Sequence, residues 1–95
     1  MNDGSLLMQS SDVLSRSFAG ETLVASPDGG DVHCFTASAA AVWVLLEEPR
    51  TFDDLIATLG ETYGVSAGIA TRDVEPFVRE LIERGWVIEL RDTDA

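Results

Sequence analysis

The spacing of the apolar residues changes once along this chain, at Thr36, and this change limits what the chain can fold into. Before Thr36 the sequence contains three short segments that read as β-strands, over residues 13–18, 21–26 and 31–35. The proline and glycines of "PDGG", residues 27–30, supply the backbone angles that a tight connection needs. We therefore expect three short strands in this part of the chain, with the last two joined as a hairpin.

From Thr36 onward the apolar residues recur with a period of about 3.6, which is typical of a helix with one buried face. The first helix is expected to take Thr36 as its N-cap and to end before Pro49, because a proline ring cannot continue a helix. Its buried face is expected to carry Ala39, Val42, Trp43 and Leu46.

A second helix is predicted to start at Thr51, since a threonine followed three residues later by Asp54 resembles a capping box. Gly64 is expected to end this helix, because glycine adopts the left-handed cap conformation without strain. The buried stripe of the helix is expected to contain Phe52, Leu55, Ile56, Leu59 and Tyr63.

A third helix is predicted to begin near Asp73, because that start places Pro76 in the first turn, where a missing backbone N–H is tolerated. The alternative is a kink at Pro76 that separates the helix from a short turn over residues 67–72. Gly85 occupies the position of a left-handed C-terminal cap. One side of this helix carries Val74, Phe77, Val78, Leu81 and Ile82. A last extended segment, residues 86–90, is expected to pack Trp86 against the helices.

The chain has 95 residues, a length that predicts one small domain without a deep active-site cavity. Residues 11–90 are expected to form this domain, whereas residues 1–10 and 91–95 are polar and unpatterned and are expected to be flexible. No apolar run approaches the roughly 20 residues of a membrane helix, and the N-terminal segment lacks a signal-peptide pattern. These features predict a cytoplasmic protein, and the single cysteine agrees with a reducing compartment.

His33 and Cys34 are the only histidine and the only cysteine in the chain, and their adjacency invites a catalytic interpretation. Neighbouring residues of a strand point to opposite faces, so a direct cysteine–histidine pair is not expected. A structural zinc site needs four ligands of these two kinds, and no glycine-rich phosphate loop is present. The sequence therefore predicts no enzyme activity, no cofactor and no metal site.

Acidic side chains dominate the charge of the chain, with 17 aspartates and glutamates against six lysines and arginines and a formal net charge of -11. Three helices with a hairpin would suit a winged helix whose third helix enters DNA, but the free face of the third helix is mainly acidic here. A field of this sign repels phosphate backbones and anionic lipid headgroups. We expect neither a nucleic-acid partner nor a membrane partner, and a winged-helix nucleic-acid-binding or transcription-regulatory protein remains the alternative function.

An ordered set of short motifs spans residues 29–87. It runs from "A..(I/V)W.LL" through an "R-(T/S)" helix start to a third helix that ends in "G-(L/W)-(V/L)". The matching positions are Ala41-Val42-Trp43, Leu45-Leu46, Arg50-Thr51, Leu55, Tyr63, Asp73-Val74, Phe77-Val78, Leu81 and Gly85-Trp86-Val87. In this order the motifs resemble the PqqD-like family, the small leader-peptide-binding proteins also called RiPP recognition elements. The chain departs from the family at Phe35-Thr36, where most members carry Leu-Asn, and the departure leaves the subfamily and the client peptide open.

This resemblance implies an α+β fold in which a three-stranded antiparallel sheet is followed by a winged-helix-like bundle of three helices. It also implies a non-catalytic module of RiPP biosynthesis that captures the leader segment of a ribosomally synthesised precursor peptide by β-strand addition. The implied second partner is a modifying enzyme, such as a radical enzyme or a cyclase, or a leader protease. The expected peptide-binding residues are Asp31, Val32, His33, Cys34 and Phe35 of the third strand and Asp73, Val74, Phe77, Val78 and Leu81 of the third helix.

An open strand edge favours the same binding mode on physical grounds, because its unpaired backbone groups can bond to an added strand. The predicted binding residues also have structural interpretations. The apolar residues of the third helix are core positions first, Asp73 is equally suited to an N-cap, and the arginines of this helix can pair with its own glutamates. A plain structural or oligomerisation domain, with another copy of the chain on the same strand edge, is a third class of function.

Overall fold

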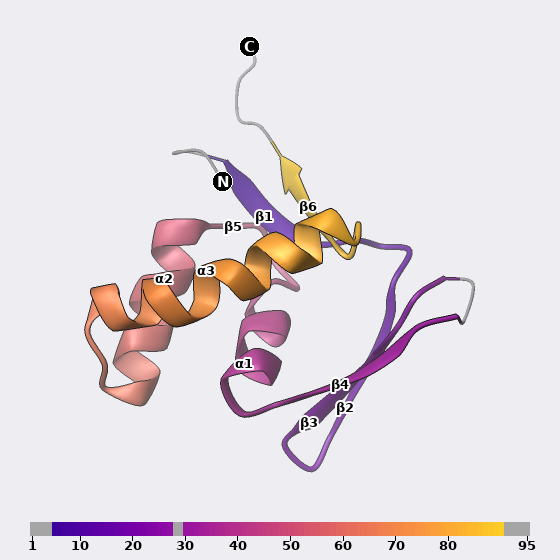
Figure 1. The fold of residues 1–95 in the computed structure, drawn as a ribbon, viewed down its shortest axis with the longest axis horizontal. Helices are drawn as coiled ribbons and strands as arrows, with labels where there is room; N and C mark the ends of the chain where they lie inside the picture. Colours follow the sequence, from indigo (N-terminus) through magenta and orange to yellow (C-terminus); the bar gives the residue numbers. More distant parts are fainter. Residues whose placement is uncertain (1–4, 28–29, 91–95) are drawn as a thin grey trace.

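The computed structural model describes residues 5–27 and 30–90, which form two antiparallel sheets and three helices (Figure 1). The elements in chain order are β1 (Leu6–Gln9), β2 (Leu14–Phe18), β3 (Glu21–Ala25), β4 (Val32–Thr36), α1 (Ala37–Leu45), β5 (Arg50–Thr51), α2 (Phe52–Tyr63), α3 (Ala67–Glu83) and β6 (Val87–Leu90). The predicted α+β class with antiparallel strands and three helices is confirmed, whereas the likeness to a winged helix stays a prediction. Among the described residues, no helix is long and apolar enough to cross a membrane.

The first sheet has the order β2-β3-β4 and contains the three predicted strands. A two-residue turn, Ala19-Gly20, connects β2 to β3, and both residues have positive φ angles of 53° and 82°. Two successive positive φ angles match the right-handed twist of the flanking strands, so this turn closes a tight hairpin.

Strands β3 and β4 form the predicted second hairpin. The Ser26 amide donates to the Asp31 carbonyl at 2.9 Å, and the Asp31 amide donates to Ser26 Oγ at 3.1 Å. Two residues of the predicted turn, 28 and 29, lie outside the described residues.

The second sheet has the order β5-β1-β6 and was not predicted. Its central strand, β1, lies within residues 1–10, so the expectation of a flexible N-terminal segment is wrong for Leu6–Gln9. Leu7 is only 1% exposed, and the Gln9 side chain donates to the Trp43 carbonyl at 2.7 Å. These tertiary contacts order a strand that local pattern alone does not reveal. Strand β6 corresponds to the predicted last extended piece and pairs with β1, while residues 91–95 lie outside the described residues.

Helices α1 and α2 begin and end close to the predicted residues. Thr36 is the N-cap of α1, although its side chain makes no capping hydrogen bond. Thr51 caps α2 by accepting a hydrogen bond from the Asp54 amide at 3.0 Å, and Gly64 ends α2 in the left-handed conformation with φ of 68°. Tyr63 is 47% exposed, so the predicted buried stripe of α2 stops one turn earlier than expected.

Helix α3 begins at Ala67, six residues before the predicted start at Asp73. Ser66 is its N-cap and accepts a hydrogen bond from the Ile69 amide at 3.3 Å. Pro76 therefore lies inside the helix, where it cannot donate to the Arg72 carbonyl. Both residues are exposed, so water can satisfy that carbonyl.

The predicted glycine cap of α3 is confirmed at Gly85, whose φ angle is 79°. The Gly85 amide donates to the Ile82 carbonyl at 3.0 Å, and the Trp86 amide donates to the Leu81 carbonyl at 2.9 Å. These two bonds form a Schellman motif, which turns the chain from α3 into β6.

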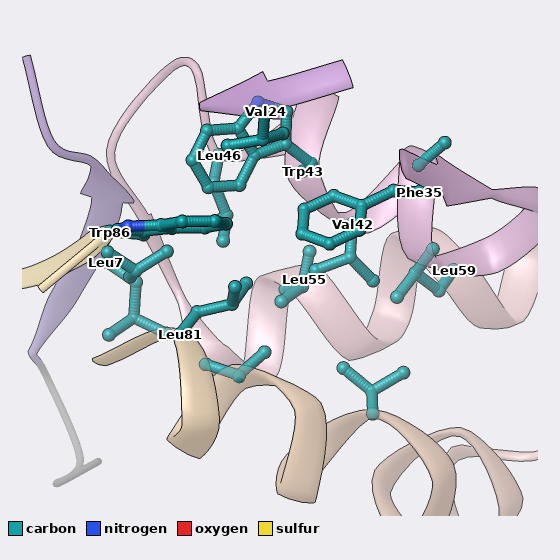
Figure 2. Packing of buried hydrophobic residues seen from close by; sticks show 14 of the residues in the cluster. Leu7, Val24, Phe35, Val42, Trp43, Leu46, Leu55, Leu59, Leu81 and Trp86 are labelled. Atoms are coloured by element: carbon teal, nitrogen blue, oxygen red, sulfur yellow. The ribbon is translucent and has the colours of Figure 1, made fainter. Parts of the chain in front are cut away.

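The hydrophobic core lies between the two sheets and the three helices (Figure 2). Trp43 and Leu46 at the end of α1, Leu55 of α2 and Leu81 of α3 are each no more than 2% exposed. Val24, at 0% exposure, brings the inner face of the first sheet into the same core. The core thus fixes the position of α3 relative to the first sheet.

Candidate functional site

Strand β4 forms one edge of the first sheet. Within residues 5–27 and 30–90, β3 is the strand that pairs with it, and the other side of β4 carries no strand. The chain leaves this edge at Thr36 and enters α1 directly (Figure 1). The edge is therefore open over the whole length of β4.

The open edge presents the backbone groups of Val32 and Cys34, and the same alternation turns the Thr36 N–H outward. The Asp31 carbonyl accepts a hydrogen bond across the hairpin, which sets the phase of the antiparallel ladder. Bonded and non-bonded pairs alternate along such a ladder, so the N–H and C=O groups of His33 and Phe35 turn toward β3. Those of Val32 and Cys34 turn outward, where an added strand can bond to them.

The side chain of Phe35 packs between β4 and the helices and is 8% exposed. Its ring meets Phe77 of α3 edge-on, with ring centroids 5.2 Å apart, and meets Trp43 of α1 at 5.9 Å. These separations are in the favourable range for aromatic pairs. Helix α3 is thereby held against the inner face of β4.

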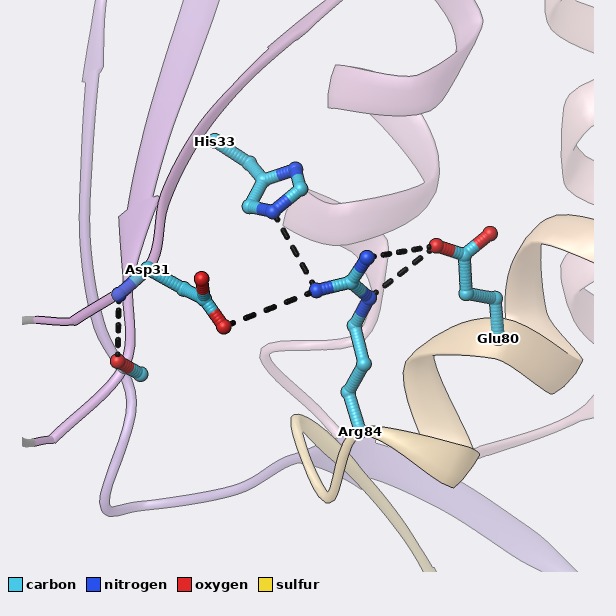
Figure 3. A network of polar contacts seen from close by, with 5 residues as sticks. Asp31, His33, Glu80 and Arg84 are labelled. Atoms are coloured by element: carbon cyan, nitrogen blue, oxygen red, sulfur yellow. Dashed lines mark hydrogen bonds and ion pairs between the residues drawn. The ribbon is translucent and has the colours of Figure 1, made fainter.

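Arg84, the C-cap of α3, forms a second link between this helix and β4 (Figure 3). Its Nε and Nη2 groups donate to Glu80 Oε2 at 3.1 and 3.0 Å. Its Nη1 atom lies 3.3 Å from His33 Nε2 and 4.0 Å from Asp31 Oδ2. The guanidinium also lies over the Trp86 ring, 5.5 Å from the ring centroid. This cluster connects the start of β4 to the end of α3.

His33 and Cys34 have separate neighbours on the two faces of β4, as predicted. The His33 ring meets Trp86 edge-on at 5.2 Å, whereas Cys34 Sγ donates to Glu21 Oε1 at 3.6 Å. Desolvation, the charge of Glu21 and this hydrogen bond all raise the pKa of the Cys34 thiol. A thiol whose pKa is raised, and which lies on the opposite face from the histidine, is not arranged as a nucleophile with a base.

The described residues contain no group of three histidine, cysteine, aspartate or glutamate side chains placed to hold a metal ion. The surface around β4 therefore consists of outward backbone groups, aromatic rings and the cluster around Arg84. Such a set can bind an extended chain.

The predicted binding residues Asp31–Phe35 all lie at the open edge, but those of α3 divide into two groups. Phe77 contacts β4 through Phe35, and Asp73 is exposed, with its carboxylate 3.5 Å from Arg72. The other three, Val74, Val78 and Leu81, are 7%, 0% and 2% exposed. All three belong to the hydrophobic core, and the contact of these residues with a peptide stays a prediction.

The link between Arg84 and β4 was not predicted from the sequence. The arginines of α3 were expected to pair with glutamates of the same helix, and the ion pairs Arg84–Glu80 and Arg79–Glu75 confirm that expectation. The further contact of Arg84 with His33 joins residues 51 positions apart. No spacing rule within one helix could have identified it.

Three surface cavities are lined in part by residues of α3 or of its C-terminal end. The largest, about 550 Å³, lies at the start of β4, and its lining includes Asp12, Ser26, Asp31, Arg84 and Trp86. A second, about 510 Å³, lies on α3 itself and is lined by Pro76, Arg79, Glu80, Glu83 and Arg84. The third, about 130 Å³, lies beyond the end of β4 and is lined by Ser38, Leu59, Tyr63, Val65, Ile69, Ala70, Asp73 and Val74. The first cavity reaches Asp31 just before β4 and the third reaches Ser38 just after it, while no residue of β4 itself lines any of the three.

Comparison with known proteins places this arrangement in context. The model of a family described as Coenzyme PQQ synthesis protein D (PqqD) matches residues 21–87, more than two thirds of the chain. Among solved structures, the chain is similar to the one described as TbiB1 in complex with the TbiA(beta) leader peptide. The TM-score is 0.76 and the sequence identity 22%, over 93% of this chain and 98% of that chain, so the likeness concerns the fold. A search of curated proteins gave no match.

Proposed function

Because this chain belongs to the PqqD family, we propose that it is a non-catalytic module that binds the leader segment of a ribosomally synthesised precursor peptide. The leader adds to β4 as an antiparallel strand. The module then presents the bound precursor to a modifying enzyme or a leader protease. Ribosomal synthesis of the precursor makes the cytoplasm the compartment in which the two meet.

The open edge of β4 is the observation that carries this proposal. Val32 and Cys34 direct their backbone groups away from β3, and an added strand satisfies them without regard to its side chains. Helix α3 supplies the side-chain surface beside this edge, through Phe77, Glu80 and Arg84. Backbone pairing for affinity and side-chain contacts for selection together constitute β-augmentation. The similar structure that contains a leader peptide supports the same reading.

The charge of the chain supports a basic partner. A net charge of -11 on a small domain accelerates association with a positively charged peptide or enzyme and opposes association with nucleic acid. Binding should therefore slow as salt is raised and the Debye length falls to about 8 Å at physiological ionic strength. The winged-helix nucleic-acid-binding alternative is not favoured.

The test uses synthetic peptides that cover the N-terminal parts of the products of short open reading frames found beside the gene for this chain. Affinity is measured by calorimetry, and amide hydrogen exchange is then compared with and without the peptide that binds. We expect new protection of the Val32 and Cys34 amides, because these donors face the added strand. The amides of β2, at the opposite edge, should exchange at an unchanged rate.

Two outcomes would contradict the proposal. If a peptide binds and the exchange of the Val32 and Cys34 amides does not change, the binding site lies elsewhere. If none of the encoded peptides binds, while duplex DNA binds at physiological salt, the class of partner is wrong.

A further inference from the structure

The first sheet has an outer face, which points away from the core and is exposed. The register of the strands puts three residues of each strand on this outer face: Leu14, Arg16 and Phe18 of β2, Glu21, Leu23 and Ala25 of β3, and Val32, Cys34 and Thr36 of β4. The large apolar side chains among them, those of Leu14, Phe18, Leu23 and Val32, are 67%, 80%, 52% and 64% exposed. Exposed apolar side chains that lie together indicate an interaction surface more often than scattered ones do.

Two charged side chains lie on the outer face, and their charges cancel. Arg16 has no ion-pair partner within residues 5–27 and 30–90, and Glu21 accepts a hydrogen bond from the Cys34 thiol at 3.6 Å. The outer face is therefore neutral, although the chain as a whole carries a formal net charge of -11. A neutral face with one charge of each sign can be complementary to a copy of itself, because each charge can meet its opposite across a two-fold axis.

The positions of the charged residues select one such axis. Leu23 lies at the centre of the outer face, and the line from Phe18 through Leu23 to Val32 crosses the three strands diagonally. Rotation about this line sets each of these apolar residues against its own copy. The same rotation brings Arg16 beside Glu21 of the second copy, because the two residues lie on either side of the line. The strands of the two sheets then cross at near right angles, which is one of the two common ways in which sheets pack.

We propose that the outer face of the first sheet binds a second copy of this chain in this two-fold arrangement. The inference goes beyond the proposed function, because the dimer is formed by side chains and leaves the outward backbone groups of β4 free. Three strands about 4.8 Å apart and five residues of about 3.3 Å each give a face of about 15 by 17 Å. This is less than the roughly 800 Å² per partner of a standard interface, so the dimer is a weak one, with a dissociation constant of about 0.1 mM.

Salt should strengthen this association, because the two copies have the same negative net charge and repel each other. The test is sedimentation equilibrium of the full chain at protein concentrations from about 0.01 to 1 mM. We expect the dissociation constant of the dimer to fall about threefold between about 0.05 and 0.5 M sodium chloride. A chain that stays monomeric at about 1 mM in high salt would overturn the inference and leave the outer face to a different protein.

Two charge variants distinguish pairing of Arg16 with Glu21 from the effect of net charge. Arg16→Glu and Glu21→Arg each bring like charges together across the axis, so each should weaken self-association about tenfold. Glu21→Arg also makes the chain less negative, and net charge alone would therefore strengthen its association. An equimolar mixture of the two variants restores opposite charges at both contacts and should dimerise at least as well as the unchanged chain. A mixture that associates no better than either variant alone would contradict the arrangement.

A matched pair of apolar variants tests the centre of the face. Leu23→Thr removes the side chain that meets its own copy, and Ile88→Thr makes a comparable change on β6, where the side chain is 39% exposed. We expect Leu23→Thr to weaken the dimer about tenfold or more and Ile88→Thr to leave it unchanged. Circular dichroism checks that both variants remain folded. Because Leu23 lies on the central strand, association through the β4 edge would be insensitive to Leu23→Thr, and that result would overturn the inference. None of these measurements uses a peptide, so their outcome is independent of the proposed function.

Discussion

The two edges of the first sheet, β2 and β4, have the same backbone chemistry and differ in what lies beside them. The two-residue turn makes Phe18 and Glu21 a bonded pair, so Ser15 and Ser17 turn their backbone groups outward from β2, as Val32 and Cys34 do from β4. All five side chains of β2 are nevertheless exposed, whereas β4 buries Phe35 and lies against α3. Unpaired backbone groups are thus common to both edges, and selective binding needs the surface beside β4.

The largest expected effect concerns two phenylalanines, one on each edge strand. Phe35→Ala should lower the free energy of unfolding by about 3–5 kcal/mol, since it empties a buried site beside the rings of Trp43 and Phe77. Phe18→Ala, at a side chain 80% exposed, should change it by less than about 0.5 kcal/mol. Urea denaturation of the two variants measures both values. Similar losses for both would mean that the two edges are supported alike.

The next prediction separates backbone pairing at the two edges. Cys34→Pro removes an outward donor without removing a hydrogen bond to β3, and Ser15→Pro does the same on β2. We expect Cys34→Pro to weaken binding of the precursor peptide at least about tenfold, because a bond is lost and the ring obstructs the added strand. Ser15→Pro should leave the affinity unchanged.

Calorimetry gives the affinities of the two proline variants, and thermal denaturation confirms that each hairpin is intact. Loss of binding in the Ser15→Pro protein with retention in the Cys34→Pro protein would move the site to β2.

A smaller effect is expected at the two arginines of α3. Arg84 and Arg79 each pair with a glutamate four residues earlier, but Arg84 also contacts β4 and the Trp86 ring. Arg84→Met should therefore destabilise the protein by about 0.5–1 kcal/mol more than Arg79→Met. Urea denaturation at low and high salt measures this difference, which should shrink as salt screens the ion pairs. Equal losses would show that the contact with His33 adds no stability.

The smallest effect concerns Cys34, whose side chain lies on the outer face of β4. Its raised pKa leaves less thiolate at a given pH, so alkylation by iodoacetamide at pH 8 should be slower than that of an unstructured cysteine peptide. Glu21→Gln removes the negative charge beside the thiol, lowers the pKa and should raise the alkylation rate about two- to fourfold. A rate that falls in the Glu21→Gln protein would contradict the cause given for the raised pKa.

Rules that act within a few residues identified most of the fold. The alternating strands, the N-cap at Thr51 and the glycine caps at Gly64 and Gly85 all follow from the local preferences of the backbone. Strand β1 could not be found in this way, because its pairing partner β6 lies about 80 residues away. The start of α3 was placed too late because the rule against proline in a helix interior was applied at Pro76, whereas the helix begins after the Ser66 cap and keeps Pro76 inside it.

In the candidate site, too, some features follow from local sequence rules and others depend on contacts between distant residues. The hairpin predicted the pairing partner of β4, and the helix that starts after Thr36 agrees with the open edge on its other side. The contact of Arg84 with His33 and the position of the cavity near Ser38 depend on how α3 crosses β4. That crossing is decided by tertiary packing of Phe35, Phe77 and Trp43, which a single sequence does not specify.

The pairing of β1 with β6 has a consequence for engineering. Leu6 lies opposite Leu90, so the first and last strands of the described fold are neighbours in the second sheet, away from β4 (Figure 1). A domain whose ends meet can be inserted as a cassette into a surface loop of another protein, or reconnected by a short linker and opened elsewhere. The Ala19-Gly20 turn is a suitable new opening. A host enzyme could then carry this module at a chosen loop with the β4 edge still facing solvent.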